Sequence, residues 1–198
     1  MRYLIMISFA IAIWTNADIA WGKVNCNIHK TYCAIVKLKP KINKTFAMKL
    51  SNEIYKASKL YKLDPYRLVA IARQESYFKM SARNKHTKSH KTITCNEWEV
   101  CTNVVTTTVT TSDFGLFQFH ISTMRTHDLD ITKVMTDMPF TVNFAAKLLA
   151  HKMKICEKLW PNTSWACYNS ANPEAHQAYV KAVNRWYLGN KNDPNKDK

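Results

Sequence analysis

The stretch Asp-Pro-Tyr-Arg-Leu-Val-Ala-Ile-Ala-Arg-Gln-Glu-Ser-Tyr-Phe, residues 64–78, predicts the helix around which the rest of the chain is interpreted. Asp64 can cap the first turn with its side chain, and Pro65 fits there because its missing N–H has no helical partner. An apolar face follows at helical spacing, formed by Leu68, Ile71 and Ala72. The next position on that face is Glu75, where a carboxylate stands in place of a hydrophobic side chain.

Glu75 has two interpretations at this point. On a buried face, desolvation disfavours the charged carboxylate and raises its pKa towards the range that suits a general acid at neutral pH. Alternatively, the helix ends here, and Glu75 turns to solvent or pairs with Arg73 or a lysine elsewhere. Perturbed carboxylates also occur in purely structural ion pairs, so periodicity alone does not decide between the two.

The composition favours one basic globular domain. The chain has 198 residues, enough for a sizeable core, and its three glycines and six prolines argue against long linkers. The net charge of +15 implies an anionic partner such as nucleic acid, anionic lipid or an anionic cell-wall polymer. The lysines are scattered and no nucleic-acid-binding motif occurs, so a charge-driven antimicrobial or nucleic-acid-binding protein is the weaker alternative.

The first residues resemble a secretory signal peptide. Arg2 supplies the positive start, and the apolar run from Tyr3 to Trp14 is too short for an ordinary membrane-spanning helix. Thr15-Asn16-Ala17 predicts cleavage after Ala17, with an uncleaved anchor as the alternative. The sequence therefore predicts an exported protein of the periplasm or cell envelope, with no stable membrane span after processing.

Six cysteines follow the predicted cleavage site, and an even number behind a secretory signal indicates disulfides. They form three close pairs along the chain: Cys26–Cys33, Cys95–Cys101 and Cys156–Cys167. Metal binding is the competing interpretation, but no Cys-x-x-Cys motif supports it. The histidines show no metal-ligand spacing either and are expected to be surface or core singles: His86, His90, His120, His127 and His151.

Helical spacing occurs on both sides of a segment rich in β-branched residues. Residues 79–112 carry lysines and histidines and then a threonine-rich run, which predicts at least one short strand or an extended loop. Residues 18–44 are basic and are expected to be irregular. Helices are expected over 45–62, over 141–159, in a short segment after Pro161, and from Asn172-Pro173 to a stop at Gly189.

Four short motifs occur in a fixed order: Glu75-Ser76, Ser112-Asp113-Phe114-Gly115-Leu116-Phe117-Gln118-Phe119, Ala166-Cys167-Tyr168-Asn169-Ser170-Ala171 and Tyr179-Val180. In this order they resemble the soluble lytic transglycosylases of the lysozyme-like superfamily, which cleave peptidoglycan. The resemblance covers roughly residues 46–187. The form Cys-Tyr-Asn-Ser-Ala-Asn-Pro is closest to specialised members that serve type IV secretion, conjugation or phage systems.

The resemblance implies a mainly α, α+β lysozyme-like fold. A helical lobe would carry a small β-hairpin excursion between the helix of the catalytic Glu and the Gly-Leu-Phe-Gln motif. The domain would span residues 45–188, after the signal peptide (1–17) and the basic N-terminal segment (18–44), and before a polar tail (189–198). Glu75 and Gly115 are farther apart in sequence than a compact family member requires. The additional residues fall in the predicted β region.

The resemblance also assigns roles to individual residues. Glu75 would protonate the glycosidic oxygen between N-acetylmuramic acid and N-acetylglucosamine, and would then act as base towards the muramoyl 6-hydroxyl, giving a 1,6-anhydro end. The implied substrate-binding residues are Ser76, Gln118, Tyr168, Asn169 and Tyr179. Gln118 and Asn169 could equally cap local backbone, and Tyr179 could be simple core. Ser76 would fix the Glu helix and the groove.

Asp113 is a possible second carboxylate. Animal-type lysozymes carry a similar acidic-aromatic-glycine sequence, and retaining glycosidases need two carboxylates close together. If Asp113 faces Glu75 across the cleft, a hydrolysing muramidase becomes the alternative, although a structural cap or cleft residue is favoured. A non-catalytic peptidoglycan-binding assembly factor is a further alternative. The family needs no cofactor, and the implied partners are glycan strands and components of a secretion, conjugation or pilus apparatus.

Overall fold

The computed structural model describes residues 29–95 and 101–187, and side chains within 29–89 and 106–187. The contact pattern divides the chain into units Met1–Lys30 and Thr31–Lys198, and every element below belongs to the second unit except the first residue of α1. The predicted signal peptide, its cleavage site and the polar tail lie outside the described residues.

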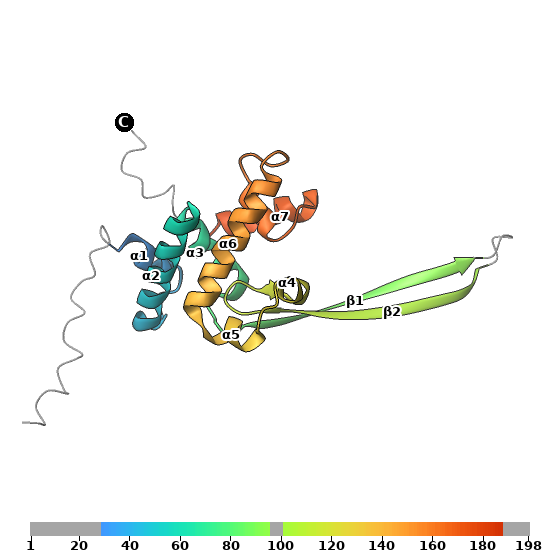
Figure 1. Cartoon of the computed structure of the whole chain (residues 1–198). Coiled ribbons are helices and arrows are strands. Elements are labelled where there is room, and N and C mark those ends of the chain that lie inside the picture. The colour runs from blue at the N-terminus through green and yellow to red at the C-terminus, as the bar shows by residue number, and fades with distance from the viewer. Residues whose placement is uncertain (1–28, 96–100, 188–198) are drawn as a thin grey trace, which may run out of the picture. The chain divides into compact units, whose positions relative to one another are not determined.

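The described part of the chain contains seven α-helices and one 3₁₀ helix (Figure 1). In chain order they are α1 (Lys30–Leu38), α2 (Lys44–Tyr61), α3 (Pro65–Ser76), α4 (Ile121–Thr126), α5 (Ile131–Thr136), α6 (Met138–Cys156), η1 (Ser164–Tyr168) and α7 (Pro173–Asn184). The strands are β1 (Arg83–Cys95), β2 (Cys101–Phe114) and β3 (Phe119–His120). The predicted mainly α fold with a β excursion is confirmed.

The central helix α3 is buried on all sides over one full turn. Asp64 caps it as predicted, with its carboxylate accepting a hydrogen bond from the backbone N–H of Tyr66 at 2.9 Å. Val69 and Ala70 are buried together with the three residues of the predicted apolar face. A helix that is apolar all round belongs in a core, which explains why α3 contacts both α2 and α7.

The long helix α6 forms the other side of this core. It contacts α2, α5 and η1, and Asp137 caps it by accepting a hydrogen bond from the backbone N–H of Phe140 at 3.0 Å. The helix begins and ends three residues before its expected limits. Helical spacing at Phe144, Leu148, Ile155 and Leu159 indicates one apolar face for this helix. That face is not buried at its C-terminal end, because Ile155 and Leu159 are 62% and 69% exposed.

The β region is much larger than the predicted short strand. β1 and β2 are 13 and 14 residues long and pair antiparallel along their whole length, while β3 pairs only with the last two residues of β2. Figure 1 shows the β1–β2 ribbon extending away from the helices. The Lys- and His-rich segment is therefore a strand, because its threonine-rich neighbour supplies a matching extended partner.

Three further differences concern helices. The segment expected to be irregular contains α1, whose Tyr32, Ala34 and Ile35 are buried against the domain. The short helices α4 and α5 were not predicted, because six residues are too few to show helical periodicity. The last helix ends at Asn184 rather than Gly189.

The cysteine prediction is confirmed where it can be followed. Cys156 and Cys167 form the expected disulfide. Cys33 is disulfide-bonded, while its predicted partner Cys26 lies outside the described residues. Cys95 and Cys101 face each other as strand partners, but their side chains lie outside the described part.

Within the described part of the chain, no helix is long and apolar enough to cross a bilayer.

Candidate active site

A cavity of about 350 Å³ collects most of the residues that the sequence singled out. It lies where the end of α3, the end of β2, the β3–α4 junction, α6 and η1 meet. Its lining comprises Glu75, Asp113, Gln118, Phe119, His120, Ser122, Thr123, Leu148, Lys152, Tyr168 and Asn169. Five side chains predicted to form the groove are thus brought together from segments that are distant in sequence.

Glu75 lies in the last turn of α3, where Tyr77 ends the helix in a left-handed conformation. The hydroxyl of Tyr179, from α7, donates a hydrogen bond to Oε1 of Glu75. Arg73 does not pair with Glu75: its Nε donates to the carbonyl of Leu38 at 3.3 Å, and its guanidinium stacks on Tyr77. The interpretation in which Glu75 pairs with Arg73 is therefore wrong.

Burial raises the pKa of Glu75 to about 7. The hydrogen bond from Tyr179 acts in the opposite direction and lowers this pKa, because it stabilises the carboxylate, while the charge of Asp113 raises it. Burial, followed by the charge of Glu75, raises the pKa of Tyr179 well above 10, so that its hydroxyl keeps its proton. Glu75 can consequently exist in both protonation states near neutral pH, with a fixed donor at one oxygen.

Asp113 is a cavity residue. Its Oδ2 lies 2.7 Å from Nε2 of His86 on β1, so His86 is a specific partner and the expectation of an isolated histidine is wrong for it. Oδ1 of Asp113 is buried and has no hydrogen-bond partner among the described residues. An acceptor oxygen in this position is available to a donor group of a bound substrate.

Gln118 both holds the local backbone and lines the cavity. Its backbone is left-handed, with φ 50°, and its side-chain amide donates to the carbonyls of Gly115 at 2.7 Å and Ala82 at 3.3 Å. Its Oε1 is buried and, in the described part of the chain, accepts no hydrogen bond. The two interpretations of Gln118 are therefore compatible, because the nitrogen fixes the turn and leaves the oxygen for the site.

Gly115 is required by the same turn. Its φ of 80° is a conformation that glycine adopts without strain, and a Cβ there would lie 2.8 Å from Cγ1 of Val134. Gly115 therefore combines a positive φ with a close approach to Val134. The turn places the backbone carbonyl of Phe117 where it accepts a hydrogen bond from the Tyr168 hydroxyl at 2.9 Å.

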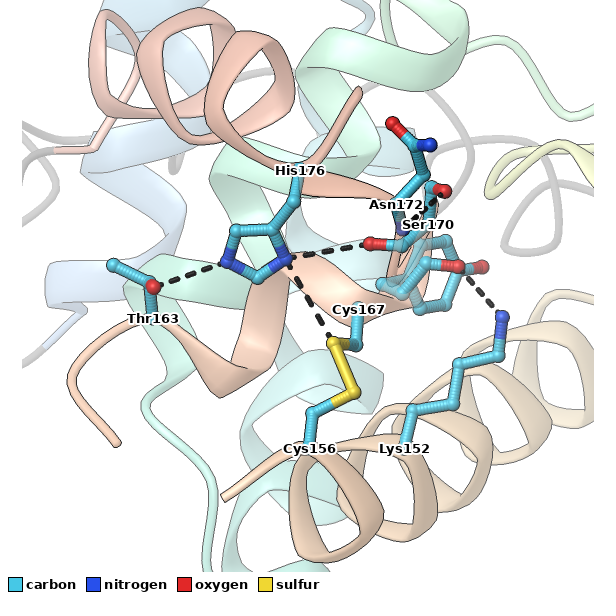
Figure 2. Close-up of a disulfide and its surroundings, with 8 residues drawn as sticks. Lys152, Cys156, Thr163, Cys167, Ser170, Asn172 and His176 are labelled. Carbon is cyan, nitrogen blue, oxygen red and sulfur yellow. Dashed lines mark hydrogen bonds between the residues drawn. A yellow bond between two sulfur atoms is a disulfide. The ribbon is translucent and has the colours of Figure 1, made fainter. Parts of the chain in front are cut away.

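The segment that carries Tyr168 and Asn169 is stabilised by a disulfide and by a buried histidine. The disulfide ties η1 to the end of α6, and Figure 2 shows His176 of α7 beside it. Nδ1 of His176 donates to the carbonyl of Ser170 at 3.3 Å, which leaves Nε2 to accept from the Thr163 hydroxyl at 3.0 Å. His176 also stacks on Trp160, so this buried histidine is structural.

Ser76 and Tyr179 do not line the cavity. The Ser76 hydroxyl donates to the carbonyl of Ala72 at 3.3 Å and accepts from the backbone N–H of Lys79 at 3.1 Å. This geometry fits the expected role of fixing the helix and gives Ser76 no contact with the cavity. Tyr179 reaches the site only through Glu75, as the holder of the carboxylate.

Lys152 is the main cavity residue that the sequence reasoning missed. Its Nζ donates to the backbone carbonyl of Tyr168 at 2.8 Å, and burial lowers its pKa. Its position four residues after Leu148 on the expected apolar face of α6 is the same signal that identified Glu75. His120, Ser122 and Thr123 gave no such signal, because they lie in the two-residue strand β3 and in the unpredicted short helix α4.

In the described residues, no group of three His, Cys, Asp or Glu side chains lies close enough together to hold a metal ion.

Comparison with known families gives one match: the family model described as Transglycosylase SLT domain covers residues 52–186. No curated protein and no solved structure matches the chain.

Proposed function

The chain belongs to the transglycosylase SLT domain family, and we propose that it cleaves the β-1,4 bond between N-acetylmuramic acid and N-acetylglucosamine in peptidoglycan, leaving a 1,6-anhydromuramoyl end. The main support for this proposal is the state and position of the Glu75 carboxyl group. This group has a pKa of about 7 and accepts a hydrogen bond from Tyr179. It lines the same cavity as Asp113, Gln118, Tyr168 and Asn169.

In the first step, protonated Glu75 acts as general acid. It transfers its proton to the glycosidic oxygen while the bond from that oxygen to C1 of the muramoyl residue breaks. The departing N-acetylglucosamine leaves with a free 4-hydroxyl group, and positive charge develops at C1. The carboxylate formed on Glu75 is then stabilised by the hydroxyl of Tyr179.

In the second step, the Glu75 carboxylate acts as base. It removes the proton from the 6-hydroxyl of the same muramoyl residue, and O6 attacks C1 to close the anhydro ring. Glu75 regains its proton and no water is consumed. A single group must therefore lose and regain one proton in each turnover, which a pKa of about 7 allows at neutral pH.

The remaining cavity residues support sugar binding. Oε1 of Gln118 and Oδ1 of Asp113 are buried acceptors that suit the N–H and O–H donors of an acetamido sugar. The buried ring of Tyr168 forms part of the wall, and Asn169 lies exposed at its edge. We assign these four residues to substrate binding and Tyr179 to positioning of the Glu75 carboxylate.

A hydrolysing muramidase is the second candidate, and the position of Asp113 is the observation that favours it. Asp113 lines the same cavity as Glu75, and its charge acts on the pKa of Glu75. A retaining glycosidase would use such a second carboxylate as nucleophile and would leave reducing muramic ends. A non-catalytic binding factor is less well supported, because a carboxylate held with a raised pKa has a cost that binding alone does not require.

Mass spectrometry of digested peptidoglycan tests both candidates. Wild-type protein should release muropeptides with 1,6-anhydro ends, and Glu75→Gln should release none while keeping its fold. Reducing muramic ends that disappear in Asp113→Asn would instead establish the muramidase. Binding of peptidoglycan without release of either product would establish the non-catalytic factor.

We further propose that the enzyme is exported and opens the wall locally for an envelope-spanning machine. The apolar N-terminal run and the bonded cysteines support export to an oxidising compartment. The Cys-Tyr-Asn-Ser-Ala-Asn-Pro form of the third motif supports service to a secretion, conjugation or phage system. Mass measurement of the mature N-terminus tests export, since a protein that still begins at Met1 in the exported fraction would overturn cleavage after Ala17.

A further inference from the structure

The β1–β2 ribbon has two faces, and the strand register assigns each side chain to one of them. Side chains alternate along a strand, and the contact between His86 and Asp113 places both on the side of the cavity. The cavity face, as we call it, consists of Asn84, His86, Lys88, Val109, Thr111 and Asp113. Hydroxyl pairs occupy the opposite face, where Thr87 lies 3.4 Å from Thr110 and Ser89 lies 3.3 Å from Thr108.

The cavity face continues the surface of the active site. Asp113 lines the cavity itself, His86 contacts Asp113, and Lys88 and Val109 are cross-strand neighbours farther along the ribbon. Val109 and Asp113 are four steps apart along β2, at about 3.3 Å a step, so the face reaches roughly 13 Å beyond the cavity. A linear polymer bound at Glu75 can therefore continue past Asp113 onto this face.

This face is open to solvent. The His86 side chain is 49% exposed and Val109 is 46% exposed, and Lys88 is exposed as well. Besides β1, the described elements that contact β2 include β3, α4 and α5, and β3 pairs only with Asp113 and Phe114 of β2. An exposed two-stranded ribbon gains little stability from its own packing, so its side chains are not needed for a core.

The charge of the ribbon suits an anionic ligand. Residues 83–89 and 106–112 contain three cations, Arg83, Lys85 and Lys88, and no aspartate or glutamate. Asp113 lies next to this segment, where β2 reaches the cavity, and its carboxylate is in contact with His86. On the cavity face, Lys88 is therefore the exposed cation that a ligand leaving the cavity meets next.

We infer that the cavity face binds the peptide-bearing part of the glycan strand, with Lys88 pairing with a carboxylate of a peptide stem. This rests on the proposed function, because it places the bond to be cleaved at Glu75. Peptide stems branch from the muramoyl residues and carry free carboxylates and alanine methyl groups. Lys88 supplies the opposite charge, and Val109 supplies an apolar contact for a methyl group. The ribbon thus selects peptide-substituted strands over bare glycan.

Binding to insoluble peptidoglycan tests this inference without interference from turnover if every protein carries Glu75→Gln. The two matched variants are Lys88→Glu on the cavity face and Lys85→Glu on the opposite face, because both change the net charge equally. Each is measured at low salt against intact sacculi and against sacculi stripped of peptide stems by an amidase. Lys88→Arg serves as the conservative variant that retains the charge.

Lys88→Glu should weaken binding to intact sacculi by about fivefold or more, because an exposed attraction becomes a repulsion. The preference for intact over stripped sacculi should fall in this variant, persist in Lys85→Glu and be retained in Lys88→Arg. Equal losses in the two glutamate variants would overturn the inference in favour of general attraction to an anionic wall. An unchanged preference in Lys88→Glu would overturn it as well.

The proposed function is tested separately by product analysis of the protein with Glu75 intact. Release of anhydro muropeptides together with an unaltered Lys88→Glu preference would overturn only the role of the ribbon. A protein that neither releases products nor binds sacculi would overturn both proposals.

Discussion

Replacing Glu75 by Gln should stabilise the protein, and the gain should increase with pH. The pKa of the Glu75 carboxyl is about 7 in the folded protein and 4.5 for an unperturbed glutamate. Well below pH 4.5 the Glu75 carboxyl is protonated in both the folded and the unfolded chain. Burying this neutral acid then costs no more than burying the amide of Gln. As the pH rises towards 7, the unfolded chain loses this proton before the folded chain does, so wild-type stability falls.

The size of this effect follows from the two pKa values. The gap between 4.5 and about 7 corresponds to about 3 kcal/mol at full ionisation, because each pKa unit is worth 1.36 kcal/mol. Most of that loss develops between pH 5 and pH 8. Gln has nearly the same shape as the protonated acid and does not titrate, so it avoids the loss and can still accept the Tyr179 hydrogen bond.

Urea unfolding of wild type and Glu75→Gln at pH 5 and pH 8 measures the difference. The variant should gain about 2 to 3 kcal/mol relative to wild type between the two pH values. Glu157→Gln is the matched control, because Glu157 is exposed just after α6. A stability difference that is the same at both pH values, or that shrinks as the pH rises, would refute the assignment of Glu75 as a buried acid with a raised pKa.

Four further changes have defined outcomes. Tyr179→Phe removes a hydrogen bond that lowers the pKa of Glu75, so the decline of kcat/KM at alkaline pH should move up by about 1 to 2 pH units, with a lower plateau; a decline that stays in place would contradict the positioning role. Asp113→Asn removes a charge that raises this pKa, so the same decline should move to lower pH while anhydro products persist. Gly115→Ala should lower the free energy of unfolding by about 2 kcal/mol, because it combines a strained φ with a clash against Val134; an unchanged denaturation midpoint would show that the turn can shift. The double variant Cys156→Ala/Cys167→Ala opens a loop with a sequence separation of 11 and should cost about 3 kcal/mol when both proteins are unfolded under oxidising conditions; an unchanged free energy of unfolding would show that this disulfide does not stabilise the fold.

Local signals in the sequence were sufficient for α3 and its acid. The Asp-Pro start, the apolar spacing and Glu75 on the same face are properties of one short segment, and helical geometry alone converts them into a prediction. The same holds for α2 and for the Cys156–Cys167 pair, which is close in sequence. The Lys152 signal was present too, four residues after Leu148.

The tertiary structure decided which side chains meet at Glu75 and how far the β region extends. Tyr179 and Asp113 reach Glu75 from other elements, and the pairing of His86 with Asp113 depends on the register of two strands. Helical periodicity predicts that a residue is buried, but it does not predict which residue of another element contacts it. The raised pKa of Glu75 is therefore the sum of a burial that the sequence could predict and of contacts that only the folded chain creates.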